Sequence, residues 1–147
     1  MSRRPARLEP DPAIVERLRA LCGPLPDVVE EEAWTGVRWS VRRRTFAHVM
    51  VAQEGYVAGR HVAGFRALPA TVLTVHAEGA DLMTLQAVGP PFHDQPWSPT
   101  AIGMVLDDDT DWDEVADLVA ESWRVRAPIS LRRRTDPPGP EAARPAR

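Results

Sequence analysis

The sequence predicts a single α+β domain with about five strands between an N-terminal and a C-terminal helix. The chain has 147 residues, 44% of them hydrophobic, which is the size and composition of one ordinary globular domain. Apolar residues recur at helical spacing near both ends of the chain. Between these two regions, apolar and polar residues alternate in short runs bounded by glycine and proline, which is typical of half-buried strands.

The first helix is predicted from Asp11, an N-cap residue followed by proline at the first helical position. Its apolar stripe consists of Ile14, Leu18, Leu21 and Cys22. Gly23 and Pro24 then end the helix. Because Cys22 lies on the stripe, we expect a small core residue rather than a reactive thiol. As the only cysteine, it excludes an intrachain disulfide.

Three strands are predicted next, and the first, 28–34, is the weakest because three glutamates interrupt it. Residues 37–41 alternate strictly between apolar and polar, and residues 46–50 continue the pattern after a turn. The two runs form a predicted hairpin whose tip is Arg42, Arg43 and Arg44. The glycine-containing segment 53–69 is predicted to be a long, mobile loop.

The second half predicts a strand at 71–77, a short helix at 78–88 and a last strand at 101–106. The final helix begins with Asp111 as N-cap and Glu114 three residues later, the spacing of a capping box. Its inward face consists of Val115, Leu118, Val119, Ser122 and Trp123, and Pro128 closes the helix. Trp123 is therefore predicted to be a core residue. Trp39, on the apolar face of the strand at 37–41, is predicted to be a core residue as well.

Composition predicts three regions along the chain. Residues 1–10 are a flexible basic N-terminus, 11–131 a single domain, and 132–147 a disordered tail rich in arginine and proline. The formal net charge is -3, but the two basic ends are separated by an acidic body. An acidic body repels nucleic acid, so any such binding must come from local patches of arginine.

Short motifs in a fixed order resemble one known family. They are Leu25-Pro26-Asp27-Val28, Trp34-Thr35-Gly36, Arg44-Thr45-Phe46-Ala47, Pro91-Phe92 with Trp97, Ile102-Gly103-Met104-Val105-Leu106-Asp107, Asp111-Trp112-Asp113-Glu114-Val115, Glu121-Ser122-Trp123-Arg124 and Ala127-Pro128. In this series the chain resembles the MmcQ/YjbR family, small bacterial proteins often described as DNA-binding. The resemblance implies an antiparallel sheet with helices packed mainly on one face, and it implies no established activity.

The chain also departs from that family at two places. After Ala127-Pro128, where relatives commonly have lysines, it has Ile129-Ser130-Leu131, and the basic residues follow only at Arg132, Arg133 and Arg134. After Trp97 it has Ser98-Pro99-Thr100 in place of glycine with a basic residue.

The sequence predicts no catalytic centre, metal site or cofactor. The acidic run that starts at Asp107 has Trp112 and Leu118 where a calcium loop needs glycine and glutamate. None of the four histidines, His48, His61, His76 and His93, pairs with another at the spacing of a metal site. His93-Asp94 resembles a catalytic fragment, but no motif-placed nucleophile accompanies it.

Two binding functions remain as hypotheses. The first is weak, non-specific DNA binding by the arginine-tipped hairpin, aided by Arg132, Arg133 and Arg134. The alternative is a protein- or small-ligand-binding module that uses a groove near Trp34, Trp97 and His93 together with loop 53–69. We expect a cytoplasmic protein without a membrane partner, because no signal peptide or membrane-length apolar run is present.

Overall fold

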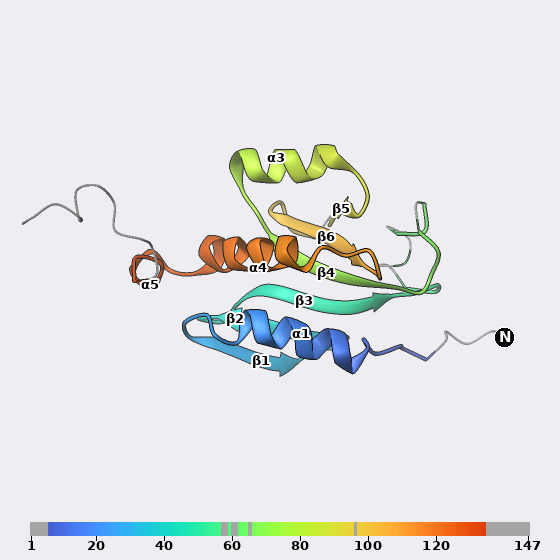
Figure 1. Cartoon of the computed structure of the whole chain (residues 1–147), viewed down its shortest axis with the longest axis horizontal. Helices are drawn as coiled ribbons and strands as arrows, with labels where there is room; N and C mark the ends of the chain where they lie inside the picture. The colour runs from blue at the N-terminus through green and yellow to red at the C-terminus, as the bar shows by residue number, and fades with distance from the viewer. Residues whose placement is uncertain (1–5, 57–58, 60–61, 65, 96, 135–147) are drawn as a thin grey trace, which may run out of the picture.

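The computed structural model of the chain describes residues 6–56, 59, 62–64, 66–95 and 97–134 (Figure 1). The elements are α1 (Pro12–Cys22), β1 (Val28–Glu32), β2 (Val37–Val41), β3 (Arg44–Ala52), β4 (Ala70–His76), α3 (Gly79–Val88), β5 (Phe92–Asp94), β6 (Ala101–Leu106), α4 (Trp112–Arg126) and α5 (Ile129–Arg132). Parts of the predicted flexible N-terminus (1–5), loop 53–69 (57–58, 60–61 with His61, and 65) and tail (135–147) lie outside the described residues.

The strands form one antiparallel sheet in the order β1-β2-β3-β4-β6-β5. The α+β class is confirmed, and the sheet has six strands rather than about five. The additional strand, β5, is a three-residue edge strand with one buried residue, Phe92, which is too short to produce an alternating pattern. The four-residue helix α5 was also not predicted.

Helices α1 and α4 lie on one face of the sheet, and α3 lies beside β5 and β6 (Figure 1). Strand residues that point toward these helices form the main core, with Trp39 and Trp123 as its largest side chains. Both are at most 1% exposed, as predicted from the sequence. Cys22 is also fully buried, and burial raises the pKa of its thiol to about 12, which keeps it protonated at neutral pH.

The first strand forms despite its three glutamates because it is at the edge of the sheet, where their side chains reach solvent and arginines. Glu30 accepts hydrogen bonds from Arg19 and from the indole nitrogen of Trp39, at 2.8 and 2.9 Å. Glu31 forms an ion pair with Arg38 on the neighbouring strand. The strand ends at Glu32, two residues before the predicted end.

One hydroxyl group ties α4 to the middle of the sheet. Ser122 is fully buried; its Oγ donates to the carbonyl oxygen of Phe46 on β3 and accepts the backbone N–H of His76 at the end of β4. The pairing of β2 with β3 shifts at this point, so Phe46 is an extra residue in its strand. Ser122 therefore satisfies backbone groups that the sheet leaves unpaired.

The opposite face of the sheet is partly covered by described residues of segment 53–69. Val62 and Leu68 from this segment pack on Ala52, Val72 and Val105 in a second, smaller core. In the described part of the chain, no helix has the length and apolar character needed to cross a membrane.

Candidate functional site

The predicted arginine tip is a two-residue turn. Val41 pairs with Arg44, so Arg42 and Arg43 alone form the connection, and both have positive φ, 48° and 68°. Arg42 donates to Asp27 at 2.8 Å and forms an ion pair with it, which neutralises its charge. Arg43 and Arg44 are exposed, and neither forms an ion pair with any residue that the structure describes.

Arg126, in the last turn of α4, lies beside the hairpin. Its Nε donates to the carbonyl oxygen of Thr45, the second residue of β3, at 3.0 Å. Burial lowers the pKa of Arg126, and the nearby positive charge of Arg44 lowers it further. The sequence places two arginines in this helical turn, but it does not reveal that one of them reaches the hairpin.

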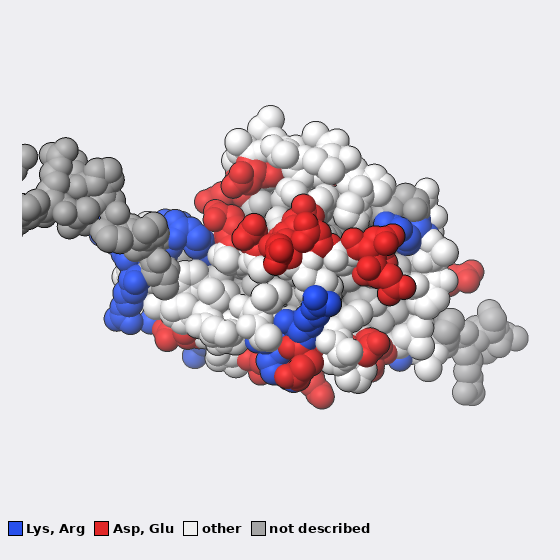
Figure 2. All heavy atoms as spheres, viewed as in Figure 1, with Lys and Arg blue, Asp and Glu red and all other residues white. Residues whose placement is uncertain are grey.

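Helix α5 places further arginines at this end of the molecule. Leu131 is buried in the core, and Arg132 donates to the carbonyl oxygen of Arg124 at 3.3 Å, so α5 is held against the end of α4. Figure 1 shows α5 next to the end of α4, and Figure 2 shows basic side chains gathered there. We call this surface the basic end; it comprises Arg43, Arg44, Arg126, Arg132 and Arg133. Arg134, also predicted as a binding residue, directly follows it.

His76 lies at the same end of the sheet, where β4 finishes. Its Nδ1 is 2.8 Å from Thr100 Oγ1. Burial, and then the charges of Arg126 and Arg44, lower its pKa to about 4, so the imidazole is neutral at pH 7. The positive charges of Arg44 and Arg126 therefore lie close together at this end of the sheet, and such a local concentration of positive charge attracts anions.

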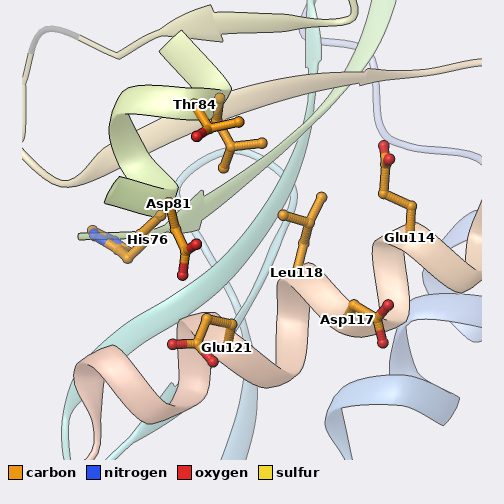
Figure 3. A pocket seen from close by; sticks show the side chains of 9 residues that line it. His76, Asp81, Thr84, Glu114, Asp117, Leu118 and Glu121 are labelled. Atoms are coloured by element: carbon orange, nitrogen blue, oxygen red, sulfur yellow. The ribbon is translucent and has the colours of Figure 1, made fainter. Parts of the chain in front are cut away.

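The helix-covered side of the molecule is acidic instead. Acidic side chains form a band across it in Figure 2. Part of the band surrounds a cavity of about 360 Å³ between α3 and α4, into which Figure 3 shows Asp81, Glu121 and Leu118 projecting. Within the described residues, no three His, Cys, Asp or Glu side chains are placed to hold a metal ion. The charge is thus separated between an acidic helix layer and the basic end.

A family model described as YjbR matches residues 24–125. The chain belongs to the YjbR family. No curated protein and no solved structure matches the chain. The YjbR match contains the hairpin and most of α4, and it stops just before Arg126, so α5 and its arginines lie beyond the matched region.

The three groove residues predicted within the YjbR region are not brought together. Trp34 is 83% exposed between β1 and β2, whereas Trp97 is 55% exposed and follows β5, so the two lie at opposite edges of the sheet. His93 lies across Gly103, where a Cβ would come within 2.3 Å of its Nε2. The three residues therefore do not line one shared groove.

Proposed function

We propose that this protein is a non-enzymatic binding protein that contacts the phosphate backbone of DNA weakly, with little sequence preference, through the basic end. The observation that supports this proposal is the convergence of Arg44 and Arg126. They come from different elements, they lie close enough for one charge to lower the other's pKa, and neither forms an ion pair within the described residues. Guanidinium groups bind phosphate oxygens in a bidentate manner, so a bound phosphate would relieve this repulsion.

The conformation of the hairpin tip also supports a role for its arginines. A two-residue turn with positive φ at both positions strongly prefers Asn-Gly, whereas Arg42 and Arg43 occupy these positions here. A residue with a Cβ in this conformation costs about 1 kcal/mol or more relative to glycine. Arginine at the tip therefore places a positive charge at a protruding turn and lowers the stability of the fold through backbone strain. Strained backbone of this kind is concentrated at functional sites.

We expect DNA binding with little sequence preference because the basic end has no element suited to contact base edges. It consists of a turn, a helix C-terminus and a short helix, and no described helix projects from it to enter the major groove. The acidic band on the helix layer repels DNA from the part of that face that it covers, which favours approach through the basic end.

The test is a fluorescence-anisotropy titration of a labelled DNA duplex at low salt. The double variant Arg43→Ala/Arg44→Ala should bind at least about tenfold more weakly than the wild type, as loss of charge-assisted phosphate contacts predicts. The matched control is Arg17→Ala/Arg38→Ala, which loses the same two charges. Arg17 stacks on Trp112 and Arg38 pairs with Glu31, both away from the hairpin tip. Absence of wild-type binding at low salt, or equal weakening in both variants, would reject the proposal.

A further inference from the structure

Residues 6–8 cross the start of segment 53–69 in an arrangement that resembles a bound peptide. The side-chain amide of Gln53 accepts the backbone N–H of Leu8 at 2.8 Å and donates to the carbonyl oxygen of Ala6 at 3.0 Å. One side-chain amide thus forms hydrogen bonds with the backbone on both sides of Arg7. Gln53 is only 6% exposed, so its position is fixed by its surroundings.

The side chain of Arg7 lies between two aromatic rings. Its guanidinium carbon is 3.8 Å from the ring centroid of Trp34 and 4.1 Å from that of Tyr56. Stacking on both rings selects a flat, delocalised cation, which an arginine provides and a lysine does not. Arg7 is therefore held in two ways. Gln53 binds the backbone on either side of it, and the rings of Trp34 and Tyr56 bind its guanidinium group.

The turn that presents Trp34 is held by the sheet and not by the N-terminal segment. Ala33 donates to the carbonyl oxygen of Gly36 at 3.0 Å, and His48 on β3 contacts the carbonyl oxygen of Thr35 at 2.6 Å. Gly36 has φ +73° and lies so close to Val49 that a Cβ would meet its carbonyl oxygen at 1.8 Å. Trp34 remains 83% exposed even with Arg7 beside it, so its ring has surface left for a ligand.

We propose that Gln53, Trp34 and Tyr56 form a binding site for an extended, arginine-bearing peptide segment of a partner protein, and that residues 6–8 of the chain occupy this site intramolecularly. The geometry defines the ligand. It has arginine at the central position, a carbonyl group before it, and any residue except proline after it, because Gln53 accepts that residue's N–H. This inference is independent of DNA binding at the basic end.

An internal segment competes at high effective concentration, so the partner's segment must displace it. The site is therefore masked in the free protein and becomes accessible when Arg7 is removed. The probe is a fluorescein-labelled, terminally blocked peptide of the chain's own sequence Pro-Ala-Arg-Leu-Glu-Pro, titrated with full-length protein.

The variant Arg7→Ala should bind this peptide at least about tenfold more tightly than the wild type, since the internal competitor is weakened. Arg17→Ala, which removes the cation stacked on Trp112, is the matched control and should behave as the wild type. In the Arg7→Ala protein, replacing the peptide's arginine by lysine should weaken binding, and replacing its leucine by proline should abolish it. Adding Trp34→Ala should also abolish it.

A second measurement uses the unaltered protein. Hydrogen exchange at the Leu8 amide should accelerate on addition of millimolar peptide and remain unchanged with the proline-containing peptide. The proposal is overturned if Arg7→Ala binds the peptide no better than the wild type, if binding persists without Trp34, or if Leu8 exchange does not respond to the peptide.

Discussion

The indole nitrogen of Trp123 donates a hydrogen bond to the backbone carbonyl oxygen of Pro26 across 3.0 Å. The two residues are 97 positions apart, and their contact joins α4 to the connection between α1 and β1. Trp123 is also 1% exposed within the main core. A single side chain of α4 therefore packs in the core and also satisfies a backbone acceptor in the α1–β1 connection.

Replacing Trp123 by alanine should lower the free energy of unfolding by about 3–5 kcal/mol, because it leaves a large cavity in the core. Trp123→Phe should cost less, since most of the packing remains and Pro26 loses only its donor. Urea unfolding followed by circular dichroism measures both. The control Met83→Ala, at a residue 70% exposed on α3, should change stability by no more than about 0.5 kcal/mol. A loss below about 1 kcal/mol for Trp123→Ala would show that this account of the core is wrong.

Ser122→Ala should cost about 1–3 kcal/mol although it removes a single oxygen atom. The substitution leaves the carbonyl of Phe46 and the N–H of His76 without their buried partner. Ser130→Ala, at an exposed position of α5, is the matched control and should be nearly neutral. Equal unfolding midpoints for the two variants would mean that water or a rearranged strand replaces the hydroxyl.

Arg43→Gly should change stability and DNA affinity in opposite directions. Glycine adopts the observed φ of 68° without strain, so the variant should unfold at a denaturant concentration corresponding to about 1 kcal/mol of added stability. The same substitution removes an exposed charge from the basic end and should weaken DNA binding. Urea unfolding and an anisotropy titration on one preparation test both effects. A glycine variant that is less stable would contradict the turn geometry.

Stability should fall as the pH is lowered from about 6.5 toward 4, in part through His76. Its pKa is lowered from 6.5 to about 4 in the folded protein, so the unfolded chain binds the proton more readily in this range. At about 1.4 kcal/mol per pKa unit, the effect between pH 7 and pH 5 is about 2 kcal/mol. His76→Gln should reduce this loss without abolishing it, because burial also lowers the pKa of His48. The measurement is urea unfolding at several pH values. If the free energy of unfolding falls equally with pH in the wild type and in His76→Gln, the lowered pKa of His76 is contradicted.

The helices and most strands could be predicted because their signals are local. The sequence predicts Asp11 and Asp111 as N-caps, and in the structure each accepts backbone N–H groups at the start of its helix. The edge strand β5 was missed because Phe92 alone is apolar and buried, and α5 because it has only four residues.

The arrangement of the binding surfaces could be predicted only in part. The arginine tip follows from a two-residue turn between alternating strands. The pairing of Arg42 with Asp27 and the approach of Arg126 to Thr45 depend on tertiary packing, which no local pattern encodes. The same holds for Gln53, whose hydrogen bond to Leu8 spans 45 residues.

The salt dependence of DNA binding is the most direct test of the proposed function. If the basic end neutralises about three to six phosphates, log K should fall against log salt with a slope of about -3 to -5. Arg43→Ala/Arg44→Ala should reduce the magnitude of the slope by about two, one for each lost contact, and Arg17→Ala/Arg38→Ala should leave it unchanged. A flat slope for the wild type, or an unaltered slope in the hairpin variant, would contradict binding through the basic end.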